Sequence, residues 1–72
     1  MEINIDKIME YIVLNGLTKT QFAKECKISY STLNKILNNN KRVNLKGILK
    51  ISITMGISIQ DMFVDKINFY SK

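Results

Sequence analysis

Residues 18–38 read TKTQFAKECKISYSTLNKILN, and this stretch decides the fold. Apolar or small side chains recur in it at helical spacing, and almost all the residues between them are Lys, Thr, Ser, Asn or Gln. The apolar or small positions are Phe22, Ala23, Cys26, Ile28, Leu33, Ile36 and Leu37. This spacing predicts helices that bury one face and leave the other in water.

Two helix-start signals divide the stretch into two helices. Thr18 and Gln21 have the spacing of a capping box, in which each side chain bonds the backbone N–H of the other residue. Ser29 can cap a second helix that begins at Tyr30. The residues between the helices, 26–29, match the three to four residues that join the helices of a helix-turn-helix. We expect Ala23 to face the partner helix, where there is no room for a larger side chain.

Further helices are predicted on both sides of this motif. A first helix near residues 4–15 should begin around Asn4 or Asp6 and end at Gly16 in the left-handed conformation. Asn44 should cap a helix over residues 45–55, with Ile53 at least partly exposed. Its expected inward residues are Leu45, Ile48, Leu49, Ser52 and Met55. Ser58 and Asp61 predict a fifth helix through Ile59, Met62 and Phe63. The expected fold class is all-α, a compact five-helix bundle.

Length and composition exclude several classes of protein. Seventy-two residues make one domain, and 46% hydrophobic residues with no Pro and three Gly suit a helical bundle. The single Cys26 allows no intramolecular disulfide and indicates a reducing compartment. There is no secretory signal and no stretch of about 20 apolar residues, so we expect a cytoplasmic protein without membrane contact. With no His and scattered carboxylates, we expect no enzyme, metal, cofactor or small-molecule ligand.

Positive charge is concentrated around the motif. The formal net charge is +5, but residues 15–50 hold eight Lys or Arg against Glu25 alone, a balance of +7. Residues 1–14 have a balance of −2, and residues 51–72 are neutral. A surface that only needs to be soluble mixes the two signs more evenly, so this asymmetry favours a polyanionic partner.

The motif resembles the DNA-binding helix-turn-helix of the Cro/CI-type (Xre-like) bacterial and phage repressors. The resemblance extends from Leu17 to Phe63. The matching residues are Leu17, Ala23, Ile28, Ser29, Ser31, Thr32, Leu33, Ile36, Asn44, Leu45, Gly56, Ile57, Ser58, Ile59, Met62 and Phe63. Two positions depart from the family pattern: Lys27 stands where the turn usually has Gly, and Lys19 stands where Gln often contacts phosphate. A non-Gly residue at positive φ costs about 1 kcal/mol.

The resemblance implies a lambda-repressor-like fold that binds double-stranded DNA, with the second motif helix in the major groove. Asn, Lys, Ser and Tyr can all bond base edges. We therefore expect base contacts from Tyr30, Ser31, Asn34 and Lys35, although an ordinary solvent-exposed face remains the alternative. We expect phosphate contacts from Lys19, Thr20, Lys27, Thr32, Asn38, Asn40, Lys41, Arg42 and Lys46, although the loop with Lys41 and Arg42 can also be simply solvated.

The expected organisation is a single DNA-binding domain, residues 1–72. It comprises a first helix at 1–16, the helix-turn-helix at 17–38, a loop and two helices at 39–63, and an extension at 64–72. The extension is too apolar for a solvated tail: it can extend the fifth helix, pack back on the core, or form an edge strand or helix that pairs with a second subunit. We favour a symmetric dimer, with contacts from Ile53, Ile67, Phe69 and Tyr70. The leading hypothesis is a homodimeric repressor on a palindromic operator. The alternative is an antitoxin or adaptor that uses the same fold to bind a protein.

Overall fold

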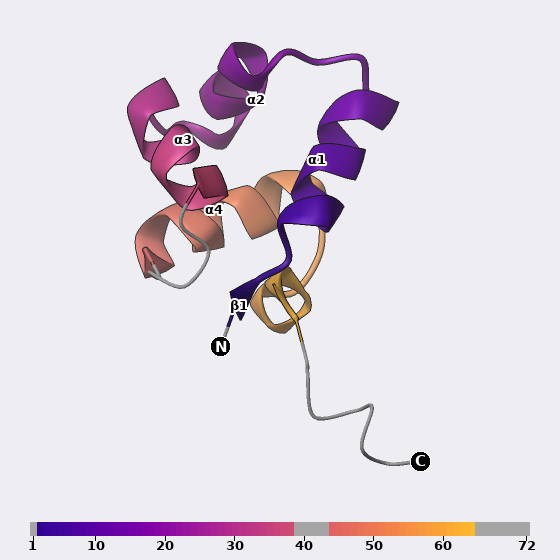
Figure 1. The fold of residues 1–72 in the computed structure, drawn as a ribbon, viewed down its shortest axis with the longest axis vertical. Coiled ribbons are helices and arrows are strands. Elements are labelled where there is room, and N and C mark those ends of the chain that lie inside the picture. The colour runs from indigo at the N-terminus through magenta and orange to yellow at the C-terminus, as the bar shows by residue number, and fades with distance from the viewer. Residues whose placement is uncertain (1, 39–43, 65–72) are drawn as a thin grey trace.

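A computed structural model describes residues 2–38 and 44–64 of the chain. Four α-helices and one 3₁₀ turn follow a short N-terminal strand, and a second short strand closes the described chain (Figure 1). In chain order the elements are β1 (Glu2–Ile3), α1 (Ile5–Leu14), α2 (Lys19–Cys26), α3 (Tyr30–Asn38), α4 (Leu45–Met55), η1 (Ile59–Met62) and β2 (Phe63–Val64). The helix-turn-helix prediction is therefore confirmed, with both helices at the predicted positions.

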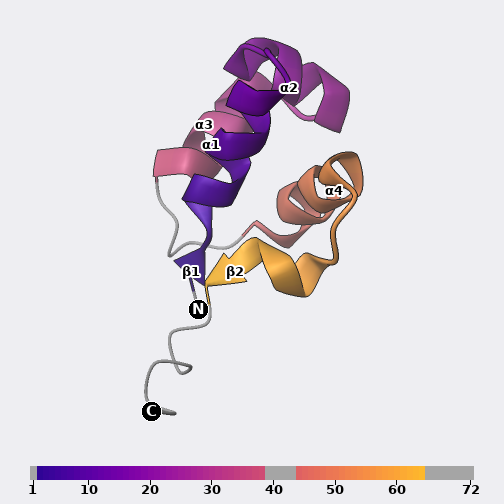
Figure 2. The ribbon, with the colours of Figure 1, turned by 90° about the vertical axis from the view of Figure 1, so that its right-hand side faces the viewer.

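The helices enclose one hydrophobic core. Its members are Ile3, Ile8, Ile12, Phe22, Ala23, Cys26, Leu33, Ile36, Ile48, Ile51 and Met62, each 3% exposed or less. In the view of Figure 2, α2 lies across the top, α1 and α3 overlap on the left, and α4 lies on the right. The rings of Tyr11 and Phe22 meet across α1 and α2 with centroids 5.6 Å apart and an interplanar angle of 56°. This tilted geometry is one that aromatic pairs favour.

Local signals fix where the helices begin and end. Asn4 caps α1 by accepting from the backbone N–H of Lys7, and Asn44 caps α4 by accepting from Gly47. Gly16 and Gly56 follow α1 and α4 with φ of 64° and 73°, the left-handed region that a residue without Cβ enters at little cost. These boundaries agree with the sequence-based prediction because each depends on residues only three or four positions apart.

The predicted fifth helix is wrong. Ser58 does accept from the backbone N–H of Asp61, at 3.4 Å, but the helical segment that follows is the four-residue 3₁₀ turn η1. The chain leaves it at Phe63, whose φ of −111° and ψ of 148° are extended. Phe63 is extended because it pairs with Ile3 in the next element, and a strand residue cannot continue a helix. The described fold therefore has four α-helices.

The β1–β2 pair is an element that the sequence did not predict. Glu2 lies opposite Val64, and Ile3 lies opposite Phe63, in antiparallel register. The backbone N–H of Asn4 also donates to the carbonyl of Met62 at 2.8 Å. With Ile3 1% exposed and Met62 fully buried, the pair closes the core at the end of the molecule away from α2 (Figure 1).

The predicted inward face of α4 was partly wrong. Ile48 and Ser52 are buried as expected, but Leu45 is 62% exposed and Leu49 is 47% exposed. Ile51, which was left out of the inward set, is fully buried, and Ile53 is 70% exposed as predicted. The buried arc differs because α4 packs against α2, α3 and η1 together. Those partners turn Ile51 into the core and turn Leu45 and Leu49 outward.

A candidate nucleic-acid interface

Two reciprocal caps position the helices of the motif. The backbone N–H of Gln21 donates to Oγ1 of Thr18 at 3.1 Å, and that of Thr18 donates to Oε1 of Gln21 at 2.8 Å. At the start of α3, the backbone N–H of Thr32 donates to Oγ of Ser29 at 3.0 Å, and the Ser29 hydroxyl donates to Oγ1 of Thr32 at 2.8 Å. Both predicted caps are therefore present, and each satisfies a backbone donor that its helix leaves free.

Lys27 makes the turn between the two helices in the left-handed conformation, with φ of 60° and ψ of 40°. It is the only non-glycine residue at positive φ among residues 2–38 and 44–64. Its backbone N–H donates to the carbonyl of Lys24 at 3.0 Å, and that of Ile28 donates to Ala23 at 3.0 Å. The turn thus has the shape that Gly would give it, and Lys27 bears the steric cost.

Helix α3 divides cleanly into a buried side and an outward side. Leu33 is fully buried and Ile36 is 2% exposed, while Tyr30 is 48% exposed. Ser31, Lys35 and Asn38 are also exposed. Of the four residues predicted to contact bases, only Asn34 is partly buried, and Thr32 is partly buried as well. The outward side therefore offers hydroxyl, amide and ammonium groups to a ligand.

Side chains of α4 form hydrogen bonds with the backbone at the end of α2 and in the turn of the motif. Nζ of Lys50 donates to the carbonyl of Lys27 at 3.5 Å. Oγ1 of Thr54 shares its one hydrogen between the carbonyl of Lys50 in α4, at 3.1 Å, and the carbonyl of Glu25 in α2, at 3.4 Å. The hydroxyl of Tyr11 in α1 donates to the Thr54 carbonyl at 3.4 Å. Sequence reasoning missed Lys50 and Thr54, because they act on residues 23 and 29 positions away and no local pattern marks such pairs.

Helix α3 and helix α4 also approach each other closely at Gly47. A Cβ added there would lie 2.9 Å from Cδ1 of Ile36, a contact that real Cβ atoms essentially never make. Gly47 is buried, so its lack of a side chain brings the start of α4 against the buried side of α3. No local pattern in residues 45–55 indicates this close approach at Gly47.

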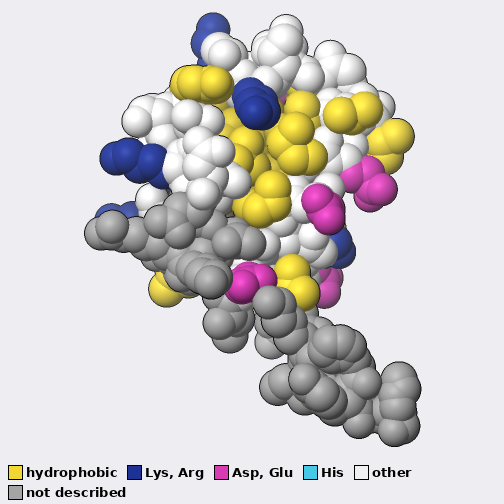
Figure 3. All heavy atoms as spheres, in the orientation of Figure 1, with side chains coloured by type: hydrophobic (Ala, Val, Ile, Leu, Met, Phe, Trp, Pro, Cys, Tyr) yellow, Lys and Arg dark blue, Asp and Glu magenta, His cyan; other side chains and the backbone are white. Residues whose placement is uncertain are grey.

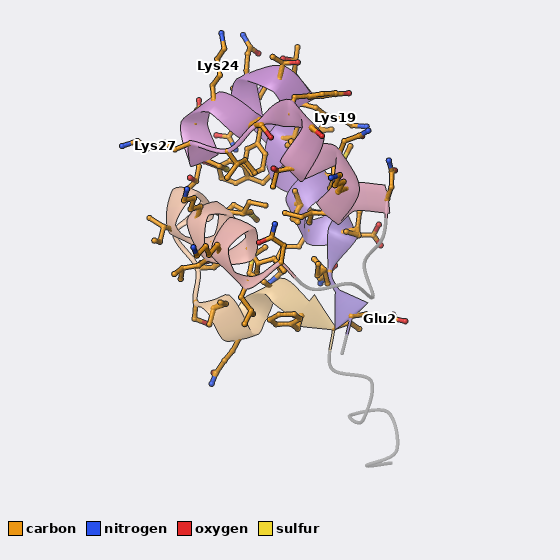
Figure 4. All side chains as sticks on the ribbon, turned by 90° about the vertical axis from the view of Figure 1, so that its left-hand side faces the viewer. Glu2, Lys19, Lys24 and Lys27 are labelled. Atoms are coloured by element: carbon orange, nitrogen blue, oxygen red, sulfur yellow. The ribbon has the colours of Figure 1, made fainter. Side chains whose placement is uncertain are left out.

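The lysines around the motif are exposed but do not all point the same way. Lys19, Lys27, Lys35 and Lys46, together with Thr20, are exposed. In Figure 4, Lys19 lies on the right, Lys24 points upward from α2, and Lys27 points left, to the side on which α4 lies. The structure therefore does not bring Lys27 together with Lys19. Six further predicted contact residues, Asn40, Lys41, Arg42, Ile67, Phe69 and Tyr70, lie outside the described residues.

The two signs of charge separate on the face of the molecule that Figure 3 shows. Figure 3 shows lysines mainly over the upper and left parts of the face, where α2 and α3 lie, and acidic side chains mainly to the right and below, where α1 and β1 lie. Residues 15–38 and 44–50 hold six lysines and one glutamate. On this face the lysines therefore gather over the motif helices, as a phosphate-binding surface requires.

A family model described as Helix-turn-helix matches residues 8–62, more than half of the chain. The chain belongs to the Cro/CI (Xre-like) helix-turn-helix family. Neither the search of curated proteins nor the search of solved structures found a significant match.

Membership of this helix-turn-helix family indicates a DNA-binding transcription regulator and implies binding to double-stranded DNA. The base and phosphate contacts of individual residues stay predictions. Among the residues that the structure describes, no helix has the length and apolarity to cross a membrane, and no group of three His, Cys, Asp or Glu could hold a metal.

Proposed function

We propose that this protein is a transcriptional repressor that binds a palindromic operator as a homodimer, with residues 1–72 acting as a single DNA-binding domain. The observation that carries the proposal is the two-sided helix α3, with Leu33 and Ile36 in the core and Tyr30, Ser31 and Lys35 outside. An outward polar helix on a cationic side of the protein fits the major groove of B-DNA. Occupancy of a promoter by the dimer would block transcription.

In the proposed complex, Tyr30, Ser31, Asn34 and Lys35 contact base edges. Lys19 and Thr20 at the start of α2 contact phosphates on one side of the groove, and Lys46 at the start of α4 contacts them on the other. Thr32 fits this role because its hydroxyl accepts from Ser29 and keeps its own hydrogen for a phosphate oxygen. The contacts position the dimer through phosphates and specify sequence through bases.

The experiment is selection of bound duplexes from a random pool, followed by binding titrations of the selected sequence at several salt concentrations. We expect a palindrome with half-sites about 34 Å apart. If each subunit neutralises three to five phosphates, log K against log salt falls with a slope of about −5 to −9 per dimer. A slope near zero, or no enriched sequence, would contradict the proposal.

A double variant then tests α3 directly. Tyr30→Ala with Asn34→Ala should lose preference for the selected duplex while its circular dichroism stays helical, because these side chains lie outside the core or at its edge. The matched control is Gln60→Ala, an exposed polar residue on η1, which should bind as the wild type does. Unchanged sequence preference in the double variant would rule out α3 as the reading helix.

The same titrations address the antitoxin or adaptor alternative. The exposed apolar residues of α4 favour some protein contact, and an adaptor would retard DNA only when its protein partner is added. Purified protein that retards the selected duplex alone supports the repressor. Protein that needs a partner for retardation supports the alternative.

A further inference from the structure

Helix α4 carries an exposed apolar row that the core leaves uncovered. Leu45, Leu49 and Ile53 are spaced by four residues, so they lie along one side of the helix, and they are 62%, 47% and 70% exposed. We call these three residues the α4 row. At 1.5 Å per residue the row is about 12 Å long. In Figure 2, α4 lies on the side of the molecule away from α1.

A second row of α4, formed by Lys46 and Lys50, borders the α4 row on one side. We call these two residues the lysine row. The lysine row faces the turn of the motif, because Nζ of Lys50 donates to the carbonyl of Lys27. Thr54 is the next residue on the same side of the helix, and its hydroxyl lies 3.4 Å from the carbonyl of Glu25. The other border, formed by Ile48 and Ser52, is buried. The α4 row is thus separated from the motif turn only by the lysine row.

We propose that the α4 row is the dimer interface, in which two copies of this chain pair their α4 helices antiparallel about a two-fold axis through Leu49. The proposal rests on the proposed function for its biological role. In this arrangement Leu49 meets Leu49 of the partner subunit, and Leu45 meets Ile53 of the partner subunit. The row is self-complementary, as a two-fold interface requires.

Symmetry selects the antiparallel pairing. In an antiparallel pair the two-fold axis passes between the helices at right angles to both. The lysine rows of the two subunits therefore lie on the same side of the dimer. In a parallel pair the two lysine rows fall on opposite sides. Because the motif turn lies on the side of the lysine row, the antiparallel pair places the turns of both subunits on the same side of the dimer, where a single duplex can meet both motifs.

The size and charge of this interface make it dependent on DNA. Three side chains, each about half exposed or more, cover far less than the roughly 800 Å² per partner of a standard stable interface. The antiparallel pair also brings Lys46 and Lys50 of the two subunits near each other, and like charges repel. Phosphates bound between the lysine rows would neutralise that repulsion. The free protein is therefore largely monomeric, and the dimer assembles on the operator.

Disulfide trapping tests the pairing without reference to DNA sequence. Helix axes about 8–10 Å apart, with Cα atoms about 2.3 Å from each axis, leave facing Cα atoms about 3.4–5.4 Å apart, and the upper half of that range allows a disulfide. In a Cys26→Ala background, Leu49→Cys should give a covalent dimer on oxidation. Leu45→Cys should not, because its symmetry mate lies about 12 Å further along the pair. Val13→Cys, exposed on α1, is the control for random collision.

Other cross-linking patterns overturn the proposal. Equal trapping of Leu45→Cys and Leu49→Cys would indicate a parallel pair, and trapping of Val13→Cys to the same extent would indicate collision. A chain ending at Val64 tests whether residues 65–72 cover the row instead. Trapping at Leu49→Cys that appears only after this truncation would assign the row to the protein's own C-terminal segment and overturn the second copy as its occupant.

Sedimentation completes the test and separates this proposal from the proposed function. Added NaCl should strengthen self-association several-fold by screening the lysine rows, and Lys46→Gln with Lys50→Gln should remove that salt dependence. Leu49→Glu should stay monomeric and bind one half-site, whereas Val13→Glu should behave as the wild type. Two-site binding retained by Leu49→Glu would overturn the interface alone. Wild-type protein that binds no duplex would overturn the function and leave the trapping result standing.

Discussion

At the residue scale, Lys27 combines strain with charge. A side chain in the left-handed region costs about 1–2 kcal/mol, and Gly, at some cost in unfolded-state entropy, avoids it. We expect Lys27→Gly to raise the free energy of unfolding by about 1 kcal/mol in a urea titration. If the Lys27 ammonium contacts phosphate, the same variant should lower the salt slope of DNA binding by about one per subunit. Lys24→Gly, in the last turn of α2 at negative φ, is the control and should destabilise. No gain from Lys27→Gly would show that the turn relaxes around lysine.

Cys26 gives a second prediction at this scale. Burial raises the pKa of its thiol above the ordinary value of 9.0, the hydrogen bond with Thr54 lowers it by less, and the Glu25 carboxylate raises it further. Because the folded state holds the proton more tightly, the contribution of the thiol to stability is complete below pH 9 and declines as the pH rises toward the folded pKa.

Urea titrations at several pH values measure this decline. The difference in unfolding free energy between the wild type and Cys26→Ala should shrink from pH 8 to pH 10, because the lysines titrate alike in both proteins. A constant difference would contradict the raised pKa. The thiol should also react slowly with alkylating reagents until the protein unfolds.

At the element scale, the caps decide which helices form. Ser29→Ala removes both bonds at the start of α3, at 2.8 and 3.0 Å, and should cost about 1 kcal/mol of unfolding free energy. Ser58→Ala removes the single, longer bond of 3.4 Å at η1 and should cost less. Thermal unfolding of both variants measures the contrast, and equal costs would show that the cap of α3 has no special weight.

The same scale shows what the sequence could predict. Caps such as Thr18 with Gln21 act within one helical turn, so their residues reveal them. The inward face of α4 depends instead on where α2, α3 and η1 contact it. Residues 45–55 have apolar side chains on most sides of the helix, so the sequence could not show that Ile51 would be buried and Leu49 exposed. The support that Lys50 and Thr54 give to the motif turn was missed for the same reason. The outward residues of α3 were predictable because Leu33 and Ile36 have the spacing of one helix face, and the residues on the other face are polar.

At the scale of the whole molecule, stability depends on a contact between the two ends of the described chain. Ile3 is 1% exposed and pairs with Phe63, 60 positions away in sequence. Ile3→Ala should cost about 2–5 kcal/mol, a large share of the stability of so small a domain. Ile5→Ala, at a partly buried position, should cost less in the same denaturant titration. An equal or smaller cost for Ile3→Ala would show that β1 is not part of the cooperative unit.

The β1–β2 pair has a practical consequence for anyone who wishes to extend this polypeptide. Both strands lie at the pole opposite α2 (Figure 1), so a fluorescent reporter or an effector module spliced ahead of Glu2 would leave the molecule at its far pole. Such a fusion would hold its cargo at the end of the molecule opposite α2. If the proposed function holds, the domain can therefore serve as the DNA-binding part of a fusion protein, provided that the junction leaves Ile3 in its place in the core.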